Sequence, residues 1–200
     1  LPTRTWKAII AQGERLGLYR KRDRPRLAVD EDYFTKWSPN MAYVLGFILS
    51  DGCITRGTYK GYSDSLKFGV QLRDRDILEK IKYELKAEHK LSVVKNAIHL
   101  CITSQKVVND LKKLGIFYRK SLKEVVPIIP QEYIKDFIRG VIDGDGSLWI
   151  DGHNYPTLSV SGGEKTLKFI QDHFFTKFKL YSKLSRRKYS KRLKNYLYQI

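Results

Sequence analysis

The sequence predicts a mixed α+β fold built from two pseudo-symmetric copies of one small unit. A ten-residue segment occurs twice, at residues 43–52 and 137–146, and the copies align without a gap at an offset of 94 residues. The same order of helix-like and strand-like segments follows each copy. Hydrophobic residues make up 42% of the 200-residue chain, which is enough for a packed core and excludes a disordered chain.

The repeated segment combines an apolar run with small residues and a terminal Asp-Gly. Glycine lies at Gly46 and Gly140, a small residue follows four positions later, and each copy ends in Asp-Gly. We expect each copy to be a helix that ends at this glycine in a left-handed cap. The small residues lie on one face, so two such helices can pack closely. The predicted helix-interface residues are Gly46 and Gly140, with Ser50 and Gly144 one turn later.

The elements after the first copy follow from hydrophobic periodicity. Alternating residues predict strands at residues 53–59 and 66–72, and an amphipathic pattern predicts a helix at residues 74–85. Strands near residues 91–95 and 97–102 and a helix at residues 104–114 complete an αββαββα unit. Each sheet is expected to have an apolar face under helices and a polar, basic face open to solvent.

The second copy has the same order but stops earlier. Strands are predicted near residues 147–150 and 157–161, a helix near 164–178, and strands near 183–189 and 195–200, so this unit lacks its last helix. A predicted helix within residues 5–18, which includes Trp6, is a candidate to cover that sheet. The chain divides into a basic N-terminal extension (1–29), a first half (30–118), a linker (119–130) and a second half (131–200).

Charge narrows the class of partner. The formal net charge is +17, and residues 177–194 contain nine Lys or Arg and no acid, with a second basic cluster at residues 15–26. Such a charge indicates a polyanion or an anionic membrane surface. The longest apolar run, residues 41–49, is too short to cross a membrane, and no signal peptide opens the chain. The only two cysteines, Cys53 and Cys101, are too few for the set of disulfides typical of secreted proteins, so an intracellular location is expected.

The two Asp-Gly sequences place a carboxylate where a helix disfavours one. Asp51 and Asp145 would lie in the last turn, beside unpaired carbonyl oxygens and the negative end of the helix dipole. A hard divalent cation accepts both kinds of oxygen, so the carbonyls of Ser50 and Gly144 are candidate metal ligands with the aspartates. Two crowded carboxylates with bound cations suit metal-assisted phosphodiester hydrolysis by water. A single Asp-Gly is more simply a helix-ending turn; two in register favour a site.

These segments resemble the LAGLIDADG motif of homing endonucleases, and the order of elements from residue 30 to residue 200 is similar to that family's. Asp51 and Asp145 fall on its metal-binding acidic position. Two departures occur: Leu49 replaces the motif's earlier Asp, and Arg139 stands at a position that is usually small. Asp143 is interpreted as structural, because Leu49 is its counterpart.

The resemblance implies a monomeric, intron-encoded enzyme of the prokaryotic cytoplasm or an organelle, whose two sheets form a saddle across double-stranded DNA. Cleavage of both strands would depend on Mg²⁺, with two or three ions and with Mn²⁺ as a substitute, and would leave short 3′ overhangs. By resemblance, Lys120 is the catalytic basic residue and Gln71 the polar strand residue near the site. For both, the alternative is a contact with the DNA backbone or a surface position without a role in the site.

Outward positions of the strands are expected to read bases, and the basic clusters to bind phosphates. The predicted DNA-binding residues are Arg56, Tyr59, Lys67, Gln71, Arg73, Arg75, His99, Arg186, Arg187, Lys188, Tyr189, Lys191 and Arg192.

Other functions stay open at this point. An RNA maturase of the same fold would bind intron RNA without cutting DNA, and a regulator would bind DNA only; both are disfavoured because both aspartates remain. An intein is disfavoured because no nucleophile begins the chain and no His-Asn ends it. A basic α/β protein that binds RNA is the alternative outside the family.

Overall fold

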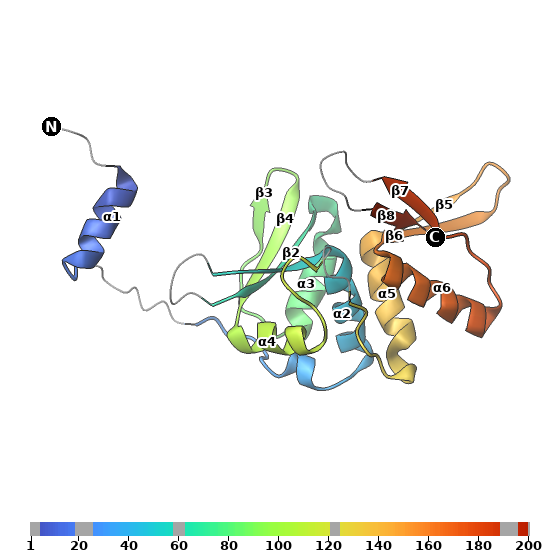
Figure 1. The fold of residues 1–200 in the computed structure, drawn as a ribbon, viewed down its shortest axis with the longest axis horizontal. Coiled ribbons are helices and arrows are strands. Elements are labelled where there is room, and N and C mark those ends of the chain that lie inside the picture. Colours follow the sequence, from blue (N-terminus) through green and yellow to red (C-terminus); the bar gives the residue numbers. More distant parts are fainter. Residues whose placement is uncertain (1–4, 19–25, 58–62, 121–124, 189–195, 200) are drawn as a thin grey trace.

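The computed structural model describes residues 5–18, 26–57, 63–120, 125–188 and 196–199. Each half supplies one antiparallel four-stranded sheet, with strand orders β1-β2-β4-β3 and β5-β6-β8-β7. The order of elements predicted from the repeat is therefore confirmed (Figure 1). The first half consists of α2 (Pro39–Asp51), β1 (Gly52–Thr55), β2 (Ser65–Gln71), α3 (Arg75–Glu84), β3 (Ser92–Val94), β4 (Ala97–Thr103) and α4 (Gln105–Lys113).

The second half repeats this order without a counterpart of α4 in the described residues. An N-terminal helix, α1 (Trp6–Arg15), precedes both halves. The second half consists of α5 (Ile134–Asp145), β5 (Gly146–Ile150), β6 (Pro156–Gly162), α6 (Glu164–Phe178), β7 (Ser185–Lys188) and β8 (Tyr196–Gln199). Short 3-10 turns are η1 (Tyr33–Thr35), η2 (Leu72–Asp74) and η4 (Gln131–Tyr133).

Strand pairing confirms the predicted alternation of faces in the first sheet. Leu66 and Phe68 of β2 are fully buried, whereas Lys67 between them pairs with Cys53 of β1 and with Cys101 of β4 on the outer face. The strand ends one residue earlier than predicted. Leu72 begins η2 and is exposed, although its amide still donates to the carbonyl of Asn96, which is the next position in the β2–β4 register.

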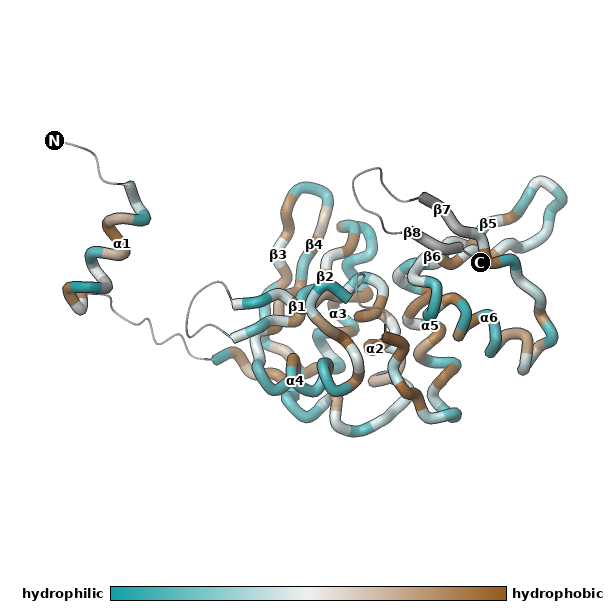
Figure 2. The backbone as a smooth tube through the Cα atoms, viewed as in Figure 1, coloured by the Kyte–Doolittle hydropathy of each residue, from teal (hydrophilic) through white to brown (hydrophobic). Residues whose placement is uncertain are grey.

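One hydrophobic core joins the two halves through α2 and α5, which lie side by side at the centre of the molecule (Figures 1 and 2). Gly46 and Gly140 allow this packing. A Cβ at Gly46 would lie 2.1 Å from the carbonyl oxygen of Phe137, and one at Gly140 would lie 2.0 Å from that of Tyr43. Backbone touches backbone at this crossing, so any larger residue would force the helices apart, as the repeat predicted.

The glycine after each aspartate serves a different purpose from the one predicted. Gly52 and Gly146 are extended, with φ of −89° and −90°, so the expectation of a left-handed cap is wrong. Each chain passes directly from helix to strand across the preceding turn. A Cβ would lie 2.7 Å from Cα of Ile48 in the first copy and 2.3 Å from the carbonyl oxygen of Ile142 in the second. Glycine is required there for close approach.

The two sheets differ in how well their inner faces are covered. Ile54 and Leu66 pair across β1 and β2 under the first half's helices and are 2% and 0% exposed. Their counterparts Leu148 and Leu158 pair across β5 and β6 but are 75% and 38% exposed. Apolar residues of α4, including Val107, Val108 and Leu111, are buried in the first half. In the described part of the second half, no helix takes that place.

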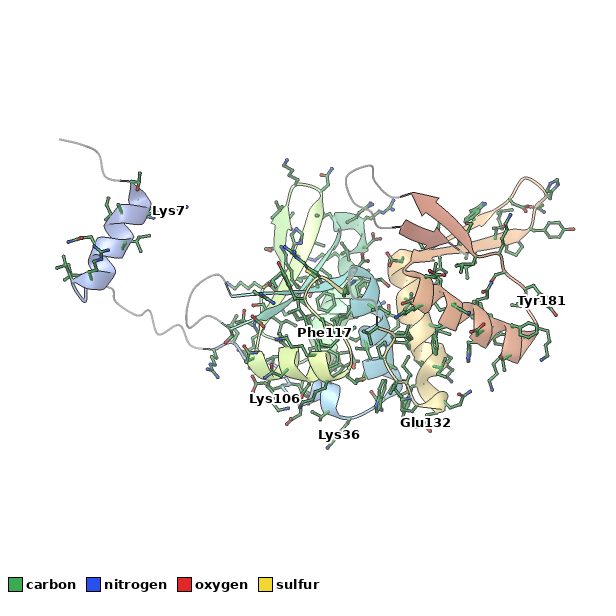
Figure 3. All side chains as sticks on the ribbon, viewed as in Figure 1. Lys7, Lys36, Lys106, Phe117, Glu132 and Tyr181 are labelled. Atoms are coloured by element: carbon green, nitrogen blue, oxygen red, sulfur yellow. The ribbon has the colours of Figure 1, made fainter. Side chains whose placement is uncertain are left out.

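Helix α1 does not fill the gap. It lies at the far end of the long axis, beyond the first half, as the position of Lys7 shows (Figures 1 and 3), and Trp6 is 75% exposed. The prediction that residues 5–18 cover the second sheet is therefore wrong. A ten-residue amphipathic helix is too short to dictate a docking site by itself, since its sequence specifies an apolar face but not the surface that receives it. None of the helices in the described ranges is long and apolar enough to span a membrane.

Candidate active site at the ends of the paired helices

The two aspartates of the repeat end neighbouring helices at the same edge of the core. Asp51 is the last residue of α2 and Asp145 the last of α5. Asp51 leans toward α5, because one of its carboxylate oxygens would lie 3.4 Å from a Cβ built on Gly144. The helix crossing at Gly46 and Gly140 thus brings both acids to one site, as predicted.

The pKa shifts of Asp51 and Asp145 show that the two carboxylates lie in a crowded, partly buried site. Burial first, and then the negative charge of Asp145, raise the pKa of Asp51 to about 6, although the ammonium of Lys120 opposes both effects. Asp145 keeps an exposed surface, yet the protein packed around its carboxylate raises its pKa too, and Lys120 again opposes the rise. Both acids are therefore harder to ionise than a free aspartate unless a cation stands beside them.

Lys120 supplies a cation within the protein itself. Its ammonium donates hydrogen bonds to the main-chain carbonyl oxygens of Leu49 and Ser50, the second at 2.7 Å. Burial lowers the pKa of Lys120, and the negative charges of Asp145 and Asp51 work against this shift. The chain reaches the site after α4 by a turn in which Arg119 has a φ of +55°, in the left-handed region.

Ser50 and Gly144, the predicted carbonyl ligands, have structural roles in this geometry. The Ser50 hydroxyl donates to the carbonyl oxygens of Val141 at 3.1 Å and of Gly46 at 3.3 Å, which ties α2 to α5. The Ser50 carbonyl accepts a hydrogen bond from Lys120, so its role as a metal ligand stays a prediction. A Cβ at Gly144 would lie 2.4 Å from that of Ser50, so Gly144 belongs to the interface.

Asp143 is a cross-helix residue, which confirms its structural interpretation. Tyr43 of α2 donates a hydrogen bond to its carboxylate at 2.8 Å, and the guanidinium of Arg139 lies 4.8 Å from the centroid of the Tyr43 ring. Burial and the bond to Asp143 raise the pKa of the Tyr43 hydroxyl. Sequence reasoning missed Tyr43 and gave no role to Arg139.

Gln71, the predicted polar strand residue, is the exposed last residue of β2. It pairs with Ala97 on the outer face of the sheet. The turn that follows holds Asp74, whose charge contributes to the raised pKa of Asp51, so the end of β2 lies near the acidic pair. The catalytic role of Gln71 remains a prediction, as does that of Lys120.

The outer face of the first sheet carries some of the residues predicted to bind DNA. Lys67, Gln71 and His99 share this face by strand register. Arg56 follows β1, and its guanidinium lies 4.8 Å from the centroid of the Tyr118 ring. Cys53 was missed as a neighbour of the site: it lies on this face directly after Gly52 and interacts electrostatically with Lys120.

The remaining predicted DNA contacts are less well placed or lie outside the described side chains. Arg73 pairs with Asp74 at 3.7 Å, and Arg75 is held on α3 by Glu79 at 2.9 Å. The backbones of Arg186, Arg187 and Lys188 form β7, but their side chains are outside the described set, and Tyr59, Tyr189, Lys191 and Arg192 lie outside the described residues entirely.

Comparison with known proteins gives a consistent class of fold. No family model matches the sequence, and no curated protein matches it. Solved structures do. The LAGLIDADG meganuclease I-AabMI bound to uncleaved DNA has a TM-score of 0.53 and 15% identity, with 82% of this chain and 78% of that chain covered. Meganuclease I-SmaMI bound to uncleaveable DNA has a TM-score of 0.52 and 13% identity, with 82% of this chain and 78% of that chain covered.

A third similar structure is the I-LtrWI LAGLIDADG homing endonuclease bound to target DNA, with a TM-score of 0.50, 10% identity and coverage of 84% and 78%. At such low identities the likeness establishes architecture. The protein has the two-repeat α+β fold of the LAGLIDADG homing endonucleases. It also holds an acidic residue at the end of each repeat helix, as that fold's motif predicts.

Proposed function

We propose that this chain is a site-specific DNA endonuclease of the LAGLIDADG type that hydrolyses both strands of a long duplex target in a reaction dependent on divalent metal ions. The observation that carries the proposal is the pair Asp51 and Asp145, held at adjoining helix ends with both pKa values raised. A purely structural pair would gain stability from a neutral residue at either position. Retaining two mutually repelling carboxylates makes sense for binding cations.

The residues present fit Mg²⁺ or Mn²⁺. Two carboxylates are hard oxygen ligands, and in the described ranges no group of three or more His, Cys, Asp or Glu side chains gathers to form a complete metal cage. Phosphate oxygens of DNA and water would complete the coordination, which suits two or three ions shared with the substrate. Bound there, the ions would polarise the scissile phosphates and lower the pKa of attacking water.

The protein's own residues would orient and balance charge around the scissile phosphates. Asp51 and Asp145 each serve one strand, because the pseudo-symmetry places one acid in each half. Lys120 holds its ammonium against the end of α2, where it can stabilise negative charge that develops on a phosphate and keep the aspartates ionised. Gln71 is placed at the end of β2 to orient water or phosphate.

DNA binding would use the outer faces of the two sheets. The outer face of the first sheet carries the polar residues Lys67, Gln71 and His99, and the chain has a formal net charge of +17. Affinity is expected to fall steeply with salt concentration. In a plot of log K against log salt concentration, each neutralised phosphate should contribute about −0.9 to the slope. We also propose that the protein acts inside the cell as a monomer, encoded in an intron of a prokaryotic or organellar gene.

The test begins with selection of bound duplexes from a random library in EDTA, since the target is unknown. The selected duplexes are then cloned into a plasmid and incubated with the protein in Mg²⁺ or in EDTA. The proposal predicts double-strand cleavage in Mg²⁺ alone, at the selected site. Sequence-selective binding without a Mg²⁺-dependent cut would contradict it and indicate a regulator. Preference for structured RNA over every duplex would indicate a maturase.

A further inference from the structure

His99 is held against a glycine on the outer face of the first sheet. His99 of β4 pairs directly with Gly69 of β2. A Cβ built on Gly69 would lie 2.7 Å from Nδ1 of His99 and 2.9 Å from Cε1. The imidazole therefore occupies the space that any other residue at position 69 would fill. Glycine weakens a strand, so its presence in the centre of β2 marks a close approach of this kind.

This packing distinguishes the two ring nitrogens. Nδ1 is buried and has no hydrogen-bond partner among the described residues. An unpaired buried N–H is rarer and less tolerated than an unpaired acceptor, so the neutral ring carries its proton on Nε2. Nε2 is not among the buried atoms without a partner, and the His99 side chain is only half-buried, so Nε2 rather than Nδ1 is the ring nitrogen to consider as a donor to a ligand.

The neighbours of His99 leave room for a base edge. Ala97 and Cys101 flank it along β4 on the same face, and Ser92 pairs with it from β3. These are small side chains without formal charge. Lys67 and Gln71 lie diagonally across on β2. A fixed donor among small neutral side chains fits an acceptor in the major groove, namely a purine N7, a guanine O6 or a thymine O4.

We propose that His99 determines target specificity by donating from Nε2 to an acceptor on a base edge, and that Gly69 is a positioning residue that keeps the ring in place. This inference rests on the proposed function, because it requires the sheet to face duplex DNA. It assigns a role to Gly69, which has no side chain of its own with which to contact a base.

The experiment compares the base preferences of the unaltered chain with those of His99→Ala, Gly69→Ala and the double variant, by selection from a random duplex library in EDTA. Both single variants are expected to lose preference at the same one or two base pairs by roughly 5- to 100-fold, with other positions unchanged. The double variant should match His99→Ala, because Gly69 acts only through the ring. Gly152→Ala is the control, since nothing lies within 4 Å of a Cβ there.

The outcomes separate the inference from the function. If His99→Ala leaves every base preference unchanged, the reading role is wrong. If His99→Ala changes a position that Gly69→Ala does not, the positioning role is wrong. If the double variant loses more than His99→Ala, Gly69 acts by another route. If the unaltered chain selects no duplex sequence at all, the proposed function is wrong. The three preceding outcomes all require a selected sequence, so they test the inference and leave the proposed function intact.

Discussion

The ammonium of Lys120 donates a hydrogen bond to the main-chain carbonyl oxygen of Ser50 at 2.7 Å, one residue before the first aspartate of the repeat pair. This contact places a positive charge at the negative end of α2, where the last carbonyl oxygens have no partner within the helix. The same charge lowers the pKa values of Asp51 and Asp145 against the effect of burial. Lys120 therefore controls how readily the acidic pair ionises.

Replacement of Lys120 by methionine should raise the pKa of Asp51 above about 6, because the opposing positive charge is lost. Cleavage at pH 7.5 should fall roughly 100-fold while DNA affinity in EDTA changes only a few-fold. The acidic limb of the pH–rate profile should move to higher pH. Lys112→Met is the matched control, since that ammonium pairs with Asp64 at 2.9 Å instead. An unmoved acidic limb would show that Lys120 does not act on the pair.

Divalent cations should stabilise the fold in a manner that depends on pH. Asp51 holds its proton more tightly in the folded chain, with a pKa of about 6 against 3.8, so its contribution to the free energy of unfolding decreases as pH rises from about 4 to about 6. Above pH 6 Asp51 is mostly ionised and Mg²⁺ can bind, whereas below pH 5 protons compete with the metal ion for Asp51.

The measurement is Tm with and without Mg²⁺ at pH 5 and pH 7.5, for the native chain and Asp51→Asn. Mg²⁺ at 100 times its Kd should add about 2.7 kcal/mol at pH 7.5, much less at pH 5, and little in the variant. Equal stabilisation of both proteins at pH 7.5 would place the bound ion elsewhere.

The helix crossing should be intolerant of any side chain at its two glycines. Gly46→Ala or Gly140→Ala inserts a methyl about 2 Å from a carbonyl oxygen of the facing helix, so the helices must separate. We expect each to lower the free energy of unfolding by roughly 3 kcal/mol or more, measured by urea denaturation. Gly152→Ala, which meets nothing within 4 Å, should change it little. A neutral effect at Gly46 would mean that the crossing is wider than described.

Equivalent core positions in the two halves should respond differently to truncation. Ile54→Ala removes a side chain that is 2% exposed and should cost about 2–5 kcal/mol. Leu148→Ala changes the counterpart, which is 75% exposed, and should cost about 0.5 kcal/mol or less. The comparison uses chemical denaturation of both variants. A large cost at Leu148 would reveal that this face is covered in solution.

Much of the fold could be predicted because the same order of helices and strands follows each copy of the repeat. Periodicity placed the strands that contain Phe68 and Leu100 and the helix that contains Leu78, and the second copy supported each assignment. The failures have physical causes. Gly52 suggested a left-handed cap, but close approach of the chain to Ile48 also demands glycine, and sequence does not distinguish the two. The position of α1 depends on a surface that its own amphipathic pattern does not specify.

The site was predictable in its acids and less so in its surroundings. Asp51 and Asp145 were found from the repeat alone, and Lys120 from a resemblance, because it lies 69 residues beyond Asp51 and returns only through the fold. The bond from Tyr43 to Asp143 and the contact of His99 with Gly69 depend on side-chain direction across two elements. No local pattern encodes such pairs.

The most direct test of the central claim is a comparison of Asp51→Asn and Asp145→Asn with the native chain, measuring both DNA affinity in EDTA and cleavage of the selected plasmid in Mg²⁺. Asparagine preserves shape and removes the charge that holds the ion. Each variant is expected to keep an affinity within a few-fold of native, and both should lose double-strand cleavage. Native-like double-strand cleavage by either variant, or a collapse of affinity in both with the fold intact, would contradict that claim.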